Sequence, residues 1–465
     1  MATCVFFVAL LVGIVDYGAV GIETRSVLAL AVFAVLCLST LAFGLPVHTR
    51  RVLIVAALLM LSVFLVVFVQ TTPLPGWVPP SPSWAAAAPF SGQTRALISL
   101  TPADDRLALV GVALPFGFLM AGLVLFDTDE RAMRALQGMA AAGGVIALWS
   151  LLQFLFLPDT LVFGEKRFYH ESLTSFFVNR NTAATFLGLI ALTQFALFWR
   201  AAAALDWRWL VQLLDSDSSL LPEQKRLIRR AFVMGGLLAV SFIALMLTLS
   251  RGGIGASFAG FALFAVVMLV TRLRRTAERD ARHSRRRVAA AVVAIAALLL
   301  VFLLFAGQTI LRAEMRGLED SRFCVMPGIL AAIADHWPWG SGLASFEDAY
   351  APYHDADCSI NAVFKRAHNV YLEGLLTLGM FFPPLLIAGI GSLAFIFVRG
   401  LRRRRSYGFA GVLGLAALLL VVLHSAVDFS VQIPGFAISF AAFLAPVVTL
   451  CLRPARGGRD ARSAG

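Results

Sequence analysis

Four short clusters of polar residues contain the side chains of this sequence that are best suited to chemistry. Each cluster lies beside a long apolar run, where we expect a helix to begin or end. Two clusters are built around an arginine, one around a histidine with two cations, and one around a histidine and an aspartate. In chain order they are Asn179-Arg180-Asn181, Ser250-Arg251-Gly252-Gly253, Lys365-Arg366-Ala367-His368-Asn369, and His424 with Asp428.

The first two clusters combine an arginine with the expected start of a helix. Asn179 and Arg180 precede the apolar run from 182, and Arg251 lies between two apolar runs. A helix N-terminus presents free N–H groups and a positive dipole end, and a guanidinium binds phosphate through two parallel hydrogen bonds. These residues therefore predict an anion site. Capping by Asn181 and contact of Arg251 with lipid headgroups are alternatives that need no ligand.

The third cluster places Lys365 and Arg366 beside His368 and Asn369 at the start of another apolar run. Imidazole is the side chain best suited to proton transfer near neutral pH, and a positioned general base typically contributes about 10²–10⁴-fold to a rate. His368 is therefore a candidate base, and Glu373 is a candidate to orient it. A purely structural histidine is the alternative.

The fourth cluster pairs His424 with Asp428 at a spacing that puts both on one helix face if the helix persists. The two can pair with each other or with an arginine, and a structural pair is the simpler interpretation. Together with Ser425, the residue types also suggest a hydrolase triad. The sequence has no Gly-x-Ser-x-Gly motif to accompany it, which argues against that function.

The apolar runs themselves indicate a membrane protein. Of 465 residues, 59% are hydrophobic and 14% are charged, whereas soluble domains are about half apolar and a quarter charged. Runs of about 20 apolar residues match the thickness of the bilayer hydrocarbon. We expect an all-α, polytopic helix bundle that forms one membrane domain over 1–465. The expected spans, about twelve, are 3–20, 27–45, 52–70, 107–126, 136–157, 182–202, 231–249, 253–271, 288–306, 370–397, 408–425 and 432–452.

Basic residues predict the orientation of the bundle. Most of the 39 lysines and arginines fall in connections that the spans place on one side, which the positive-inside rule assigns to the cytoplasm with both termini. Arg402-Arg403-Arg404-Arg405, at a span end, is expected to meet anionic lipid. This placement explains the formal charge of +12 without nucleic-acid binding. The cytoplasmic segments would be 46–51, 127–135, 200–230, 272–287, 398–407 and the basic tail 453–465.

The first apolar run is expected to be retained as a span. It lacks a basic segment before it, and Asp16 and Glu23 follow where a signal-peptide cleavage site would need small residues.

Two long connections fall on the outer side: a segment rich in Pro and Trp at 71–106, and a large loop at 307–369. Loops of this length usually have a function. Cys324 and Cys358 share the large loop, where they form a disulfide in an oxidising compartment or remain two unpaired small residues. No cysteines have the close spacing of a metal site, so we expect no bound metal.

Taken in order, the motifs resemble those of the O-antigen ligase and polymerase family of bacterial membrane glycosyltransferases. The resemblance covers about 140–450. It rests on Phe177-Val178-Asn179-Arg180-Asn181, on Ser250-Arg251-Gly252-Gly253, on Trp337-Pro338-Trp339-Gly340-Ser341-Gly342-Leu343-Ala344-Ser345-Phe346, and on Ala367-His368-Asn369-Val370-Tyr371-Leu372-Glu373 with Gly379 beyond.

The resemblance implies transfer of a glycan from an undecaprenyl-diphosphate-linked donor to an acceptor hydroxyl, at the periplasmic face of the inner membrane. It implies no cofactor, and a helix bundle capped by the large loop. His368 and Arg251 would be catalytic. Arg180, Arg251, Arg366 and Lys365 would bind the diphosphate, supported by Asn179, Asn369, Glu373, His424 and Asp428. Trp337, Trp339, Phe346, Tyr350 and Tyr353 are candidates to stack on sugars.

Several functions stay open at this point. A ligase would use lipid A–core as acceptor, a polymerase a second lipid-linked glycan, and a protein O-oligosaccharyltransferase a protein. A transporter of a polar or lipid-linked solute and a non-catalytic scaffold are alternatives from other classes. Convergence of Arg251 and His368 on one outward cleft would favour glycosyl transfer, and their separation by the bundle would exclude it.

Overall fold

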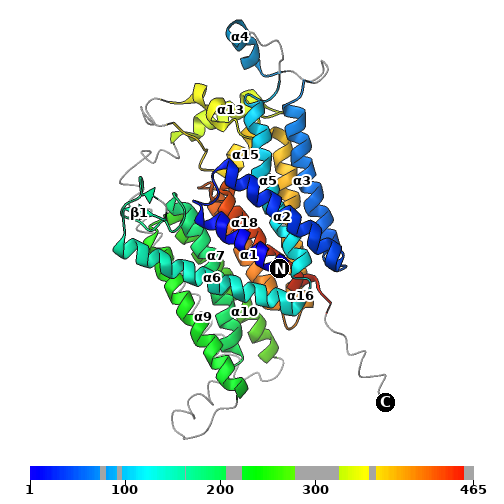
Figure 1. The fold of residues 1–465 in the computed structure, drawn as a ribbon, viewed down its shortest axis with the longest axis vertical. Helices are drawn as coiled ribbons and strands as arrows, with labels where there is room; N and C mark the ends of the chain where they lie inside the picture. The colour runs from blue at the N-terminus through cyan, green and yellow to red at the C-terminus, as the bar shows by residue number, and fades with distance from the viewer. Residues whose placement is uncertain are drawn as a thin grey trace. The chain divides into compact units, whose positions relative to one another are not determined.

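The computed structural model describes residues 1–73, 80–91, 97–162, 164–205, 222–277, 324–355 and 363–454. Within them, ten helical segments are long and apolar enough to cross a membrane, which confirms the all-α, polytopic fold (Figure 1). These segments are α2 (Ile22–Phe43), α3 (Arg50–Gln70), α5 (Pro102–Leu125), α6 (Asp129–Phe156), α7 (Arg180–Ala203), α9 (Pro222–Leu247), α10 (Arg251–Ala277), α15 (Val370–Leu378) continued through η4 (Gly379–Phe381) into α16 (Phe382–Arg403), α17 (Gly408–Ser425) and α18 (Pro434–Leu452).

Two of the expected spans differ from this set. The first apolar run forms α1 (Ala2–Val15), whose 14 residues rise about 21 Å, less than the hydrocarbon core of about 30 Å. The helix ends there because Tyr17, Gly18 and Ala19 adopt left-handed backbone conformations. The expected span at 288–306 lies outside the described residues.

The spans differ in how much of their surface the protein covers. α3 is the most apolar span, yet only 28% of its most apolar stretch is buried, and Leu58 and Leu61 are exposed. In α17 and α18 the buried share is 78% and 83%. Exposed leucines suit a lipid-facing helix, whereas covered ones belong to the protein core. α3 is therefore largely uncovered by protein, whereas α17 and α18 are largely covered.

The chain divides into two compact units. Unit 1 comprises Met1–Leu125, Ala306–Leu393 and Val422–Ala442. In it, α2 and α3 pack on α5. The first long connection of unit 1 contains α4 (Pro82–Ser91). The large loop contains α13 (Met326–His336), α14 (Phe346–Tyr350) and η2 (Ala351–Tyr353).

The described part of the large loop is folded around its own apolar core and attached to the spans of unit 1. Its core includes Ile329, Phe346 and Tyr350. Gln70, at the end of α3, donates to the carbonyls of Trp339 and Thr377 at 2.8 and 2.9 Å. Gly340 has a φ of +77°, and a Cβ there would lie 2.5 Å from the carbonyl oxygen of Thr377. The turn at 338–342 therefore requires glycine and is tied to two spans.

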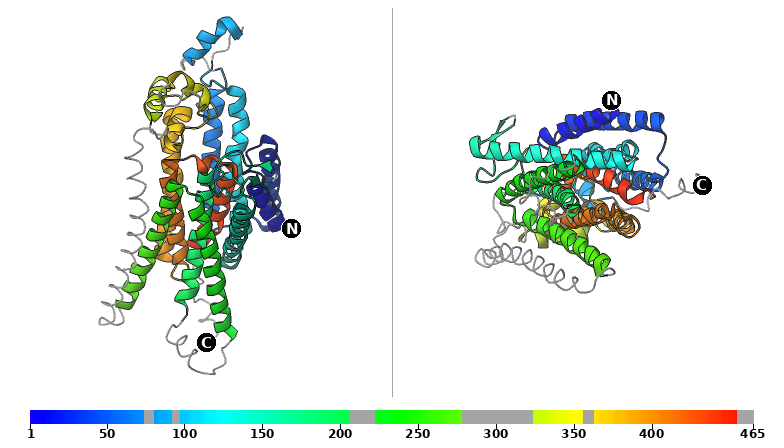
Figure 2. Two further views of the ribbon diagram at one scale, coloured as in Figure 1. Left: turned by 90° about the vertical axis from the view of Figure 1, so that its left-hand side faces the viewer. Right: turned by 90° about the horizontal axis from the view of Figure 1, so that it is seen from below.

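Unit 2 comprises Phe126–Phe305, Ala394–Val421 and Phe443–Gly465. α7 packs along α9 and α10, as the two sets of views show (Figure 1, Figure 2). The connection between α6 and α7 contains a short antiparallel hairpin of β1 (Thr160–Leu161) and β2 (Gly164–Glu165).

One arginine of the 402–405 run is buried in unit 2. Arg404 is only 5% exposed, and its guanidinium binds Asp129 at 2.7 Å and the carbonyl of Leu450 at 3.1 Å. It joins the start of α6 to the end of α18. This residue therefore fastens helices together, while Arg403 and Arg405 beside it are exposed.

We expect Arg404→Ala to lower the thermal unfolding midpoint of the detergent-solubilised protein. Loss of a hydrogen bond to a charged group costs about 1.5–3 kcal/mol when a partner stays buried. Arg403→Ala is the matched control, because exposed substitutions usually change stability by about 0.5 kcal/mol or less. Equal shifts for the two variants would contradict the structural role of Arg404.

Candidate functional site

His368 lies in unit 1, immediately before α15. Asn369 is the N-cap of α15, and its side-chain oxygen accepts from the backbone N–H groups of Tyr371 and Leu372 at 3.0 and 3.1 Å. His368 itself has a φ of 50°. A left-handed conformation is uncommon for a residue other than glycine and costs about 1–3 kcal/mol unless its surroundings impose it.

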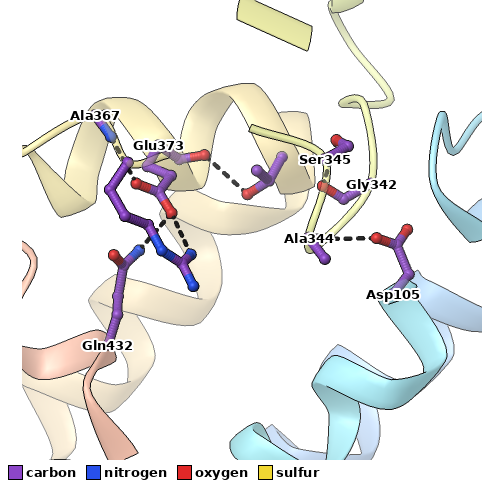
Figure 3. A network of polar contacts seen from close by, with 9 residues as sticks. Asp105, Gly342, Ala344, Ser345, Ala367, Glu373 and Gln432 are labelled. Atoms are coloured by element: carbon purple, nitrogen blue, oxygen red, sulfur yellow. Dashed lines mark hydrogen bonds and ion pairs between the residues drawn. The ribbon is translucent and has the colours of Figure 1, made fainter. Parts of the chain in front are cut away.

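The surroundings that impose it centre on Glu373, whose carboxylate is only 2% exposed. One oxygen accepts from the backbone N–H of Ala367 at 2.9 Å, and the other from Arg366 at 2.7 Å and Gln432 at 3.0 Å (Figure 3). A buried carboxylate with three donors is well satisfied. Glu373 thus fixes the backbone on the N-terminal side of His368, as a supporting role requires.

Asp428 lies beside the imidazole of His368. Its carboxylate is fully buried, accepts from Ser430 Oγ at 2.5 Å, and places Oδ2 at 3.8 Å from His368 Nδ1. The ring of Phe429 packs edge-on against the imidazole, with centroids 4.8 Å apart. The separation suits an ion pair with a protonated imidazole, and it turns Nδ1 toward the protein. Nδ1 is buried without a hydrogen-bond partner among the described residues, and Nε2 is the ring nitrogen on the other side.

α17 ends at Ser425, so His424 and Asp428 do not share one continuous helix. His424 is buried at 2% exposure. The spacing argument required a continuous helix, which the turn after Ser425 interrupts.

Two cations of unit 1 precede this histidine closely in the chain. Lys365 is exposed and makes no ion pair within the described residues. Arg366 is held by Glu373 and lies within electrostatic range of Arg25, in the first turn of α2. Sequence spacing could not connect Arg25 with Arg366. The signal that could have identified Arg25 is its position at the start of an apolar span, where an uncompensated charge is costly.

Asn179 and Arg180 lie in unit 2, at the start of α7. Asn179 is the N-cap, and its side-chain oxygen accepts from the N–H of Asn181 at 2.8 Å. The capping residue is therefore Asn179 rather than Asn181, because α7 begins at Arg180, two residues before the expected start. Asn181 instead accepts a hydrogen bond from Ser250 Oγ at 2.7 Å.

Ser250 joins the start of α7 to the start of α10. Arg251, the first residue of α10, is exposed and makes no ion pair with any described residue. Arg180 has no ion pair in the same part of the chain, and its Nε is buried without a partner there. Each arginine adds its charge to the positive end of a helix dipole, an arrangement that an anion would stabilise.

Two of the five candidate sugar-stacking rings cannot serve that function. Phe346 and Tyr350 are each 2% exposed and stack on each other inside the core of the large loop. Tyr353 donates to Asp335 at 2.6 Å, and burial together with that carboxylate raises the pKa of Tyr353 to about 12. Trp337, 53% exposed, is the most accessible of the five.

Cys324, at the start of α13, is disulfide-bonded, whereas Cys4, Cys37 and Cys451 are free. Cys358 lies outside the described residues. No group of three or more His, Cys, Asp or Glu residues in the described ranges could hold a metal ion.

Part of the chain matches a known protein family. Residues 236–381 match the family model described as O-antigen ligase. The resemblance to the O-antigen ligase family is confirmed. The matched ligase segment contains Arg251, the turn at 337–346 and His368 with Glu373, and it supports a glycosyl-transfer function in a multi-pass membrane protein. No curated protein matches the chain. The wider range of 140–450 and the convergence of Arg251 with His368 remain predictions.

We expect Glu373→Gln to destabilise the protein by about 1–3 kcal/mol. The amide N–H₂ group would replace a carboxylate oxygen that accepts hydrogen bonds, and it would face N–H donors from which it cannot accept. The change in thermal midpoint in detergent measures this. Glu347→Gln, on the exposed face of α14, is the control. An unchanged midpoint for Glu373→Gln would mean that the three hydrogen bonds do not hold the 366–369 backbone.

Proposed function

We propose that this protein transfers an undecaprenyl-diphosphate-linked glycan to an acceptor hydroxyl at the periplasmic face of the bacterial inner membrane. The observation that carries the proposal is a pair of arginines at helix N-termini without ion-pair partners in the described residues, Arg251 being inside the ligase segment. Arginines kept free of carboxylates retain their charge for a ligand. A diphosphate is the leaving group that needs such charge.

In the proposed reaction, the acceptor oxygen attacks the anomeric carbon of the donor sugar. His368 Nε2 removes the proton of the acceptor hydroxyl as the new carbon–oxygen bond forms. The bond between the anomeric carbon and the phosphate oxygen breaks, and its electron pair leaves with undecaprenyl diphosphate. This single displacement would invert the anomeric configuration.

The charged residues stabilise the two ends of this reaction. Arg180, Arg251, Arg366 and Lys365 would stabilise the negative charge that develops on the diphosphate, and one such group is typically worth about 10²–10³ in rate. Asp428, 3.8 Å from His368, would stabilise the imidazolium that proton removal produces. These cations would serve where other glycosyltransferases use a metal ion.

Two observations support the proposed compartment. A disulfide at Cys324 suits an oxidising compartment such as the periplasm for the large loop. The basic connections would then lie in the cytoplasm with both termini. The chemistry would accordingly take place on the outer side.

The proposal has two forms, which differ in the acceptor of the glycan. Lipid A–core as acceptor would make the protein a ligase, and a second lipid-linked glycan would make it a polymerase of O-antigen or exopolysaccharide. Both use the same donor and the same residues. We favour these two over a protein O-oligosaccharyltransferase and over a transporter.

We expect His368→Asn to reduce glycan transfer by about 10²–10⁴-fold and Arg251→Ala to reduce it by about 10²–10³-fold. Asparagine is chosen at 368 because it tolerates a left-handed backbone and lacks a base. The measurement is the surface glycan profile of a deletion strain complemented with each variant, at equal membrane expression. Arg403→Ala removes an exposed arginine that has no role in the proposed site, so it serves as the matched arginine control.

The pattern of loss identifies the acceptor. Short chains that are still attached to lipid A–core indicate a lost polymerase, whereas long unattached chains indicate a lost ligase. A normal profile for His368→Asn would overturn the catalytic assignment and favour a transporter or a scaffold.

A further inference from the structure

The connection between α6 and α7 carries a tyrosine that contacts one of the proposed diphosphate ligands. The guanidinium carbon of Arg180 lies over the ring of Tyr169, 5.3 Å from its centroid. A guanidinium in this position is attracted by the negative face of the ring. The ring covers one face of the guanidinium and uses none of its N–H groups as hydrogen-bond donors.

The backbone at Tyr169 is held in an uncommon conformation, with a φ of 62°. The carbonyl oxygen of Tyr169 accepts from the N–H and the hydroxyl of Ser172, at 3.1 and 3.3 Å. Lys166, only 6% exposed, donates from Nζ to the carbonyl of Ser172 at 2.7 Å. Several contacts therefore fix a strained turn, which is the usual condition for such strain to persist.

The same turn is attached to the helices that carry the arginines. The N–H of Leu173 donates to the carbonyl of Leu247 at the end of α9, at 2.9 Å. Ser250, three residues further on, binds Asn181 in the first turn of α7. Tyr169, the start of α7 and the α9–α10 turn thus belong to one hydrogen-bonded assembly within unit 2.

A ring and a carboxylate hold a guanidinium with different consequences. Arg366 is held by Glu373 at 2.7 Å, so part of its charge is already neutralised inside the protein. Arg180 is held by a ring, which fixes its orientation and leaves its full charge. Orientation without neutralisation is what a residue needs when it binds an anion.

We propose that Tyr169 is a positioning residue that holds Arg180 ready for the diphosphate of the lipid-linked donor. This inference rests on the proposed function, because it assigns Arg180 to that diphosphate. Tyr169 touches neither the sugar nor the reacting carbon. Its effect is on the affinity for the diphosphate.

The test uses undecaprenyl diphosphate, which carries no glycan, as the probe, with undecaprenol as the control lacking phosphate. Binding is measured on the full chain in nanodiscs. We expect Tyr169→Leu to weaken binding of undecaprenyl diphosphate about 3–10-fold, in the range of a cation–π contact at a partly exposed site. Tyr169→Phe keeps the ring and should stay within about twofold of wild type. Phe168→Leu, a neighbouring exposed ring, is the matched control.

A double-mutant cycle separates positioning from a general structural effect. Arg180→Gln should weaken binding, and adding Tyr169→Leu to it should produce no further loss. Additive losses, or a loss with Tyr169→Phe, would overturn the positioning role while leaving the proposed function intact. If wild type binds undecaprenyl diphosphate no better than undecaprenol, the donor assignment fails, and this inference fails with it. Thermal midpoints of all variants confirm that each one is folded.

Discussion

The start of a helix is the constraint on which the candidate site depends. The first N–H groups of a helix have no partner within it, so a side chain must satisfy them. Asn179 does so for α7 and Asn369 for α15, while Ser250 lies beside the first turn of α10. Arg180, Arg251 and His368 are next to these residues in the chain. Their positions are therefore set by the same interactions that begin the helices, at the ends of spans where water and headgroups meet the protein.

The charged groups of the candidate site are accommodated in different ways. In unit 1, Glu373 accepts from Arg366, Gln432 and the backbone, and all of its donors come from the protein. In unit 2, Arg180 rests on an aromatic ring and Arg251 faces outward. A neutralised network gives rigidity, and that of Glu373 holds the backbone of a catalytic candidate. Arginines without a carboxylate partner keep their positive charge, which an anion would stabilise.

Much of the fold could be predicted from the sequence because the hydropathy of a span depends only on residues that are neighbours in the chain. Ten expected spans correspond to the ten that the structure describes, and the class of protein follows from them. The first run failed because left-handed residues at 17–19 end α1 early, and hydropathy does not report backbone conformation. The cap of α7 was placed two residues late for a related reason, since Arg180 is polar but helical.

The site was predictable as a set of residues and less so as a set of contacts. His368, Glu373, Arg180 and Arg251 are recognisable because polar groups stand out beside apolar runs. The contact of Asp428 with His368 joins segments that are far apart in the chain, and so do the approach of Arg25 to Arg366 and the binding of Glu373 by Gln432. A period of 3.6 residues cannot reveal such pairs. They depend on how the spans pack.

The turn at 338–342 and the residues after it are fastened to the spans of unit 1 by several hydrogen bonds. Gln70 donates to the carbonyl of Trp339, Ser341 exchanges backbone hydrogen bonds with Leu100 and Leu376, and Asp105 accepts from Ala344 at 2.7 Å. Each of these bonds is worth about 0.5–1.5 kcal/mol, and more if it is broken inside the protein. Lifting this part of the loop like a hinged cover would break them all at once. The described part of the large loop is therefore fixed to the spans of unit 1 as firmly as those spans are fixed to one another, and its position is part of the fold.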